Sequence, residues 1–274
     1  MDLPPPLLDT SDDAIVRAIV EHDVFLITTL ARGAGVELHE DPDATWYLSG
    51  VPEPLFNGVV RASFPEADTD RRIDELLGRF RDAGVPATWW VGPLSARPGL
   101  SARLEARGLE RAELPGMSLD LGALVDAPPP EGVRVDVVEG AAGLDAWMEA
   151  NGEGFGIAPE DLDRYRRTPE AVLVGDLPGW CVTGWADERP VATAMVCVAT
   201  GVAGVSNVTT APAHRRRGLG AIVTTHALAL ARDHGYRTAV LTSTESGRPL
   251  YERLGFRLRC TVDVCTFTPP PPPP

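Results

Sequence analysis

The sequence predicts an α+β fold, a mixed α/β arrangement built as two copies of one unit. Strand-like and helix-like runs alternate along all 274 residues. A proline cluster, Pro128–Pro130, forms a stiff connector near the midpoint. The halves also close alike, since a helix that follows an apolar strand ends in a glycine–hydrophobe step at Gly108-Leu109 and again at Gly255-Phe256. We therefore expect domains at 1–127 and 132–268, a linker at 128–131 and a disordered polyproline tail at 269–274.

The first half opens with an amphipathic helix at 11–32, for which Ser11 is the N-cap candidate. Apolar and β-branched runs then predict strands, and amphipathic stretches predict helices. In chain order these are strands at 45–48 and 57–64, a helix at 70–83, a strand at 87–91, a helix at 100–107 and a strand at 117–121.

The second half has a similar pattern, and its last four elements follow the same order as those of the first half: helix, strand, helix, strand. The predicted elements are a strand at 133–138, helices at 144–151 and 159–166, strands at 179–186, 191–199 and 202–210, a helix at 219–234, a strand at 239–242, a helix at 249–254 and a strand at 260–267.

The charged residues exclude several functions. All 25 Lys+Arg residues are arginine, so the chain has neither a phosphate-binding P-loop lysine nor a Schiff-base lysine. The net charge of −14 argues against nucleic acid as a partner, because no basic face could dominate a polyanion. An acidic protein is better suited to a cationic substrate.

Cysteine and histidine spacing predicts no metal site. Cys181, Cys197, Cys260 and Cys265 form no CxxC pair, and the five histidines show no HExxH spacing. We expect buried, reduced thiols. The first residues show no secretory signal, and no apolar run reaches membrane-spanning length, so we expect a cytoplasmic protein without a membrane partner.

The strongest chemical signal is the segment VTTAPAHRRRGLGA, from Val208 to Ala221. A β-rich run leads through a proline turn into three arginines and two glycines, and then into a helix. Glycine lets the backbone approach a ligand closely, and the first N–H groups of a helix are unpaired and partly positive. The segment therefore predicts an anion site suited to a pyrophosphate, although a helix start with solvated arginines is the simpler interpretation. A dinucleotide fingerprint fits poorly, because its third glycine falls at Val223.

The spacing Arg-x-x-Gly-x-Gly between a strand and a helix resembles the acetyl-CoA loop of the GCN5-related N-acetyltransferase (GNAT) superfamily. The segment SGRPLYERLGF, from Ser246 to Phe256, resembles that family's closing motif. The resemblance covers about 133–267, and the first half resembles the degenerate N-terminal partner of tandem members. It implies two GNAT-like units, each a mixed, largely antiparallel sheet flanked by helices.

The resemblance also implies site residues, with acetyl-CoA as co-substrate and no metal. Parallel strands at 202–210 and 239–242 would splay apart and admit the cofactor, which would pair with the strand backbone. Tyr251 would protonate the departing thiolate, because a phenol of pKa near ~10 stays protonated at pH 7. The implied cofactor-binding residues are Val208, Thr209, Thr210, Arg215, Arg216, Arg217, Gly218, Leu219, Gly220, Ala221 and Ser246.

The general base stays open at this point. The attacking amine must be neutral, yet the strand at 202–210 carries Ser206 and Asn207 and no carboxylate. Glu153, Glu245 and a positioned water are the candidates.

The first half lacks a comparable loop. Its helix at 70–83 is preceded by Glu66 and Asp68 and starts with Asp70, where carboxylates stabilise a helix but repel a pyrophosphate. Residues 1–130 hold 22 acidic and 11 basic side chains, a net charge of −11, against −3 for 131–274. We expect no CoA site here, and a role as scaffold, acceptor-site wall or homodimer surface.

Tryptophans in the first half, at Trp46, Trp89 and Trp90, are expected in a core or interface and not in a ligand stack.

The leading prediction is an acetyl-CoA-dependent N-acetyltransferase that transfers its acetyl group directly to an amine of a small molecule, peptide or protein. A non-catalytic CoA or acyl-CoA sensor is the alternative, which the missing strand carboxylate favours and Tyr251 opposes. An interaction platform is a third reading, and the intact loop at 215–220 counts against it.

Overall fold

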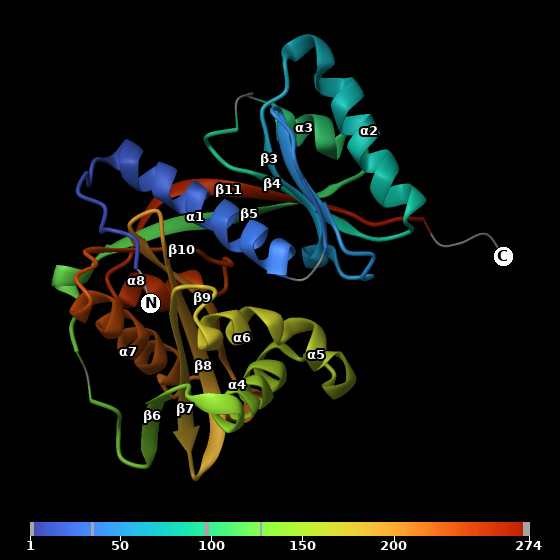
Figure 1. Ribbon diagram of the computed structural model, residues 1–274. Helices are drawn as coiled ribbons and strands as arrows, with labels where there is room; N and C mark the ends of the chain where they lie inside the picture. The colour runs from blue at the N-terminus through green and yellow to red at the C-terminus, as the bar shows by residue number, and fades with distance from the viewer. Residues whose placement is uncertain (1–2, 34–35, 96–98, 127, 271–274) are drawn as a thin grey trace. The chain divides into compact units, whose positions relative to one another are not determined.

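The computed structural model describes residues 3–33, 36–95, 99–126 and 128–270 (Figure 1). It contains two compact units. Unit 1 consists of Met1–His22 and Met117–Arg259, and unit 2 of Asp23–Gly116 and Cys260–Pro274. The chain passes between the units within α1 (Asp12–Gly33), β5 (Glu110–Asp120) and β11 (Arg257–Phe267).

The units differ from the predicted halves, because the last strand of each half belongs to the sheet of the other half. In unit 2, β11 pairs antiparallel with β4 (Ala87–Val91). In unit 1, the end of β5 lies beside β10 (Thr238–Thr242). The predicted linker at 128–131 therefore lies within unit 1. Ala127, which ends the first predicted domain, and the tail from Pro271 onward lie outside the described residues.

Unit 2 has the strand order β1-β2-β3-β4-β11. Its further strands are β1 (Glu37–Glu40), β2 (Ala44–Leu48) and β3 (Asn57–Ala62), and its helices are α2 (Thr69–Asp82) and α3 (Leu100–Glu105). Among the strand pairs described for this unit, β3 and β4 are parallel and the others are antiparallel. Trp46 and Trp89 lie in the core of this unit, which confirms the packing role predicted for them, whereas Trp90 is half-buried.

Unit 1 has the strand order β5-β10-β9-β8-β7-β6. Its strands are β6 (Val133–Val137), β7 (Gly179–Ala186), β8 (Arg189–Ala199), β9 (Val202–Thr210) and β10; its helices are α4 (Gly140–Phe155), α5 (Leu162–Tyr165), α6 (Arg167–Val174), α7 (Leu219–Asp233) and α8 (Arg248–Arg253). The strands from β6 to β9 are antiparallel, and β9 and β10 are parallel. The predicted mixed α+β class is confirmed.

Helices α4 and α7 cover opposite faces of β7, β8 and β9 (Figure 1). Alternate residues of a strand face opposite sides of its sheet. Thr193 of β8 meets Asn151 of α4, whereas a Cβ on Gly184 of β7 would meet both Val223 of α7 and Ala192 of β8. The two helices thus enclose β9, which carries the predicted site.

The predicted elements match the structure to within three residues at each end apart from five features. Helix α4 runs from Gly140 to Phe155 and is longer at both ends than the predicted 144–151. The edge strand β1 is short and polar, and α6 carries Pro169 in its first turn, so neither gives a clear pattern. β5 starts at Glu110 and not at 117. Its first residues are charged and exposed, so they lack the apolar pattern from which a strand is predicted. The predicted helix at 159–166 is divided into a 3-10 turn, Pro159–Asp161, and α5. Ser11 caps α1 as predicted, accepting the N–H of Ala14 at 3.4 Å.

All four cysteines are free, and Cys181, Cys197 and Cys265 are buried. Burial raises the pKa of the Cys181 thiol to about 12, so this thiol stays protonated. Within the described ranges, no cluster of three or more metal-ligating side chains occurs. No helix in these ranges combines the length and apolarity needed to cross a membrane.

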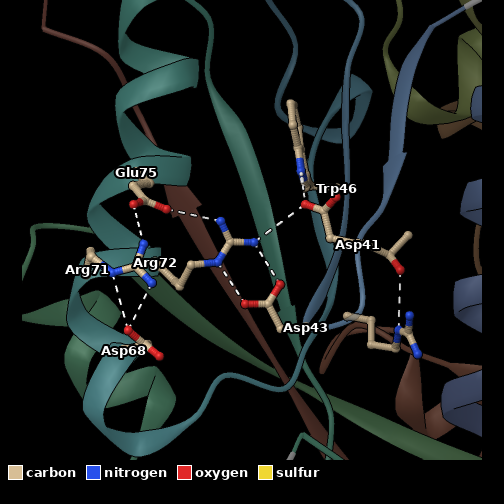
Figure 2. A network of polar contacts seen from close by, with 9 residues as sticks. Asp41, Asp43, Trp46, Asp68, Arg71, Arg72 and Glu75 are labelled. Atoms are coloured by element: carbon tan, nitrogen blue, oxygen red, sulfur yellow. Dashed lines mark hydrogen bonds and ion pairs between the residues drawn. The ribbon is translucent and has the colours of Figure 1, made fainter.

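In unit 2, a fork of ion pairs joins α2 to the turn between β1 and β2 (Figure 2). The Nε and Nη2 atoms of Arg72 each lie 2.8 Å from a carboxylate oxygen of Asp43, and Nη1 lies 3.1 Å from Glu75. The bidentate Arg72 bonds hold the pKa of the Asp43 carboxyl below its usual value. Arg71 pairs with Asp68 and Glu75 nearby but stays 57% exposed, against 18% for Arg72.

Substituting Arg72 by methionine should lower the free energy of unfolding at pH 7 by about 1–3 kcal/mol, because Asp43 loses two charge-assisted hydrogen bonds. A carboxyl with a lowered folded pKa stabilises the fold above its unfolded pKa of about 3.9, and this contribution disappears as the pH falls through the folded pKa. The deficit of the variant should therefore shrink in acid. Urea unfolding over a pH series measures it. Arg71→Met is the control and should cost below ~1 kcal/mol; equal losses in both variants would contradict the assignment.

Candidate functional site

Strand β9 carries a β-bulge. Thr193 of β8 lies opposite Thr209 and Met195 lies opposite Ser206, so Asn207 and Val208 together face the single residue between them on β8. Asn207 has a φ of 52°, a left-handed conformation that asparagine adopts more readily than other residues with a side chain. The bulge therefore bends β9 and reorients its main chain at this point.

The bulge also changes which faces the side chains occupy. In an uninterrupted strand Gly204, Val208 and Thr210 would share one face. Instead, Gly204 faces α1, whereas Val208 and Thr210 lie on the α7 side: a Cβ built on Gly220 lies 3.6 Å from Thr210 Oγ1 and 4.0 Å from Val208 Cγ1. Thr209 faces α4. Three predicted cofactor-binding residues, Val208, Thr210 and Gly220, are therefore brought together.

Strands β9 and β10 separate next to the bulge. Their parallel pairing includes Ala203–Ala239 and Gly204–Val240 and ends there, although β9 continues to Thr210. The predicted splaying of the two strands is thus present. Asn207 and Val208 have no strand partner on either side within the described residues.

The loop after β9 presents a continuous run of main-chain donors. Arg216 and Gly218 have φ values of 63° and 80°. The first helical bond of α7 runs from Ile222 N–H to the Gly218 carbonyl at 3.1 Å. The N–H groups of residues 216–221 have no acceptor in the part of the chain that the structure describes. Such a run at a helix N-terminus attracts an anion.

The three arginines of this loop have different roles. Arg215 donates from Nε to the Thr210 carbonyl at 3.0 Å and from Nη2 to the Gly154 carbonyl at 2.7 Å, so it ties the loop to β9 and α4. Arg217 Nη1 lies 3.1 Å from His214 Nδ1. Arg216 is exposed and has no polar partner among the described residues.

Tyr251 lies on α8, which packs beside the start of α7. A Cβ on Gly220 would lie 3.5 Å from Leu250 Cδ2, so the start of α7 and the helix of Tyr251 are neighbours. The Tyr251 ring packs edge-on against Phe256 at 5.6 Å between ring centres. Burial raises the pKa of the Tyr251 phenol to about 12, so the group keeps its proton throughout the physiological range.

The remaining predicted residues lie at the start of α7 and in the turn before α8. Leu219 is buried at the start of α7, and Ala221 follows within its first turn. Ser246 lies in the turn between β10 and α8, with its Oγ 3.1 Å from Thr244 Oγ1. Both carboxylate candidates for the base have an arginine nearby: Glu153 lies 3.6 Å from Arg189, and Glu245 lies 3.8 Å from Arg248.

Helix α4 approaches β9 so closely that only glycine fits at position 154. A Cβ at Gly154 would overlap Thr209 Oγ1 and also crowd the Cγ2 and Cβ atoms of Thr209. Gly154→Ala should therefore lower the free energy of unfolding by about 1–3 kcal/mol, measured by urea unfolding. Gly143→Ala in the same helix is the control: its Cβ would meet Val138 at an ordinary 3.6 Å, so it should stabilise by up to about 1 kcal/mol. Equal effects at both positions would contradict the close approach at Gly154.

The corresponding place in unit 2 is filled by ion pairs. Strands β3 and β4 pair in parallel like β9 and β10. At the start of α2, Arg103 of α3 lies 2.5 Å from Glu66 and 2.6 Å from Asp70. Arg107 adds bonds to Asp70 at 3.0 Å and to Asp74 at 2.6 Å. The carboxylates that the sequence predicted at this helix start are thus held by arginines of the following helix region.

Sequence reasoning missed the bulge and the polar residues behind it, Asn151 and Thr193. The available signal was Asn207 itself, a residue that tolerates left-handed backbone, within an otherwise β-prone run. Its consequence for the facing of Val208 and Thr210 depends on the pairing with β8, which no local pattern encodes.

Comparison with known proteins agrees with this geometry. A family model described as the acetyltransferase (GNAT) family matches residues 144–256, a range that includes β9, the donor loop and α8. Mycothiol acetyltransferase of Thermomonospora curvata is 30% identical over 212 residues, which cover 70% of this chain and 67% of the relative.

Solved structures show the same fold. A GCN5-related N-acetyltransferase from Kribbella flavida superimposes with a TM-score of 0.66 at 23% identity, covering 89% of this chain and 95% of that one. A tandem GNAT protein from the clavulanic acid biosynthesis pathway has a TM-score of 0.58 at 16% identity, covering 99% of this chain and 100% of that one. These likenesses concern the fold; with the family match and the 30% identical relative, they show that the chain is an N-acetyltransferase of the GNAT family.

Proposed function

We propose that the protein transfers the acetyl group of acetyl-CoA directly to an amine, with the cofactor bound along the free edge of β9 and at residues 216–221. The observation that supports this most strongly is the run of unpaired N–H groups at 216–221 beside a parallel strand pair that ends at Gly204 and Val240. A pyrophosphate needs several converging donors, and a pantetheine chain can pair with a free strand edge.

In this proposal the diphosphate binds the N–H groups of 216–221, and Arg216 contributes its charge. The pantetheine amide and the acetyl carbonyl bond the main chain of Val208 and Thr210. Arg215 acts indirectly, since its guanidinium fastens the loop to β9 and α4. Arg217 of the loop and Ser246 of the turn before α8 complete the set of residues assigned to the cofactor.

The chemistry follows from Tyr251. The amine nitrogen attacks the thioester carbonyl and loses a proton, and the sulfur leaves with the proton of the Tyr251 phenol. Because burial raises its pKa to about 12, the Tyr251 phenol carries its proton at pH 7 and can donate it to the sulfur as the C–S bond breaks. The thiol that forms, of pKa near ~8.5, is the stronger acid, so the tyrosinate regains a proton from water, which has taken up the proton lost by the amine. We assign the base role to a positioned water, since Glu153 and Glu245 each lie near an arginine.

For the acceptor, we propose a small cationic amine. Four carboxylates of α4 and the α5 region, those of Asp145, Glu149, Glu153 and Asp163, line a depression together with Met148, Ile157, Pro159 and Leu162. One cation, Arg166, lines it as well and pairs with Asp145 at 2.7 Å, so the carboxylates remain in excess. Carboxylates attract a protonated amine, and the apolar side chains suit its carbon skeleton. The name of the Thermomonospora curvata relative makes a mycothiol-related amine the first acceptor to test.

Unit 2 is proposed to bind no CoA, because arginines already occupy the carboxylates at the start of α2. It would then act as scaffold, acceptor-site wall or homodimer surface. A cytoplasmic location likewise stays a prediction of the sequence.

Calorimetry with acetyl-CoA and a thiol-release assay over a panel of amines test the proposal. We expect one acetyl-CoA per chain and thiol release that depends on an amine. Two binding sites would contradict the role of unit 2. Tight acetyl-CoA binding without turnover on any amine would favour the alternative, a non-catalytic acyl-CoA sensor, and absence of binding would contradict both.

A further inference from the structure

A buried chain of hydrogen bonds connects α4 and β8 to the bulge of β9, and the mechanism proposed above does not use it. Asn151 Nδ2 of α4 donates to Thr193 Oγ1 at 3.2 Å, and Thr193 Oγ1 donates to the Asn207 carbonyl at 2.8 Å. Asn151 is 2% exposed and Thr193 is fully buried. Because an unpaired polar group is costly in such a place, the chain is held in one arrangement.

A second side chain of α4 also donates a hydrogen bond to β8 opposite the bulge. Trp147, one helical turn before Asn151, donates from Nε1 to the Ala194 carbonyl at 3.4 Å. Ala194 is the residue of β8 that lies opposite the bulge and has no partner on β9. The side chains of Trp147 and Asn151 therefore bond to β8 at the place where its pairing with β9 is interrupted.

The direction of one N–H group follows from these bonds. The Asn207 carbonyl and the Val208 N–H belong to the same peptide unit, whose planar trans geometry points them in opposite directions. Since the carbonyl accepts from the Thr193 hydroxyl, which faces α4, the Val208 N–H points away from that hydroxyl. Within the described residues Val208 pairs with neither neighbouring strand, because the pairing of β9 with β10 has already ended, at Gly204.

We propose that Thr193 and Asn151 are positioning residues of the acetyl-transfer site. Through the Asn207 carbonyl they fix the peptide whose N–H, on Val208, bonds the acetyl carbonyl. They touch neither substrate nor cofactor. This inference rests on the proposed function, in which acetyl-CoA occupies the edge of β9.

Thr193→Val tests the inference, because valine keeps the shape of threonine and removes its hydroxyl. Calorimetry compares acetyl-CoA with CoA, two ligands that differ only in the acetyl group. We expect the affinity for acetyl-CoA to fall about tenfold and the affinity for CoA to stay unchanged, since one oriented hydrogen bond is lost. Thr193→Ser keeps the hydroxyl and should restore the affinity for acetyl-CoA.

Two further variants make the result specific. Thr183 is buried on β7 directly opposite Thr193, so Thr183→Val is the matched control and should leave both affinities unchanged. Asn151→Ala removes the second member of the chain and should weaken acetyl-CoA selectively, which keeps the test valid if Thr193→Val fails to fold.

Three outcomes would overturn the inference. Wild-type affinities in Thr193→Val, or equal weakening of both ligands, would leave the acetyl-CoA site in place but contradict the positioning role. If the wild-type chain bound neither ligand, the proposed cofactor site would be contradicted and the positioning role with it.

Discussion

Substituting Gly218 by aspartate is expected to weaken acetyl-CoA binding by at least about 100-fold, whereas the left-handed backbone at this position should lower the free energy of unfolding by only about 1 kcal/mol. A side chain at this position meets no atom within 4 Å, and aspartate tolerates the left-handed φ of 80° better than most residues. Its carboxylate would accept the unpaired N–H groups at the start of α7 as an N-cap. It would thus occupy the donors that a diphosphate needs and repel the diphosphate itself.

Two controls separate charge from shape in this experiment. Gly218→Asn has nearly the same shape without the charge, so its affinity should fall much less. Gly235→Asp places a carboxylate just beyond the opposite end of α7, at a glycine with a φ of 93° and open space around it, and should leave acetyl-CoA binding unchanged. If Gly218→Asp bound like the wild type, or no worse than Gly218→Asn, the diphosphate would not lie on this loop.

Tyr251→Phe should lower turnover by about 100-fold or more and leave the affinity for acetyl-CoA unchanged. Phenylalanine retains the edge-on packing against Phe256 and removes only the proton donor. Because the pKa of the Tyr251 phenol is raised to about 12, raising the pH to about 10 should not deprotonate this acid, so the wild type should show no alkaline loss of turnover from this group. Steady-state kinetics with an acceptor from the amine panel and calorimetry measure the two quantities.

A second tyrosine of unit 1 provides the control. Tyr236 is buried and donates from its hydroxyl to the Pro4 carbonyl at 2.6 Å, a bond that ties it to the N-terminal segment. Tyr236→Phe should lose stability without losing turnover. An equal loss of affinity and turnover in Tyr251→Phe, or unchanged turnover, would show that Tyr251 is not the acid.

The sequence predicted those parts of the molecule that local patterns encode. The run from Val208 to Ala221 contains its own strand, turn glycines and helix start, so the donor loop and the position of α7 followed from it. The acidic start of α2 was also readable, because Glu66 and Asp70 stand where a phosphate loop would need glycine. Each of these features depends on neighbouring residues only.

Features that depend on distant partners could not be predicted in this way. Residues 260–267 read as a closing strand of the second half, yet β11 pairs with β4 of the first half. Arg215 belongs to the phosphate motif by position, but the carbonyls of Thr210 and Gly154 bind its guanidinium. The bulge likewise exists only in relation to β8.

The location of acetyl-CoA on the full chain is tested most directly by backbone amide chemical shifts recorded with and without the cofactor. We expect the largest changes in two segments. At 216–221 the N–H groups are unpaired, and at Val205–Thr210 the strand β9 no longer pairs with β10. Changes centred on the start of α2, around Glu66 and Asp70, or no changes at saturating acetyl-CoA, would contradict the proposed site.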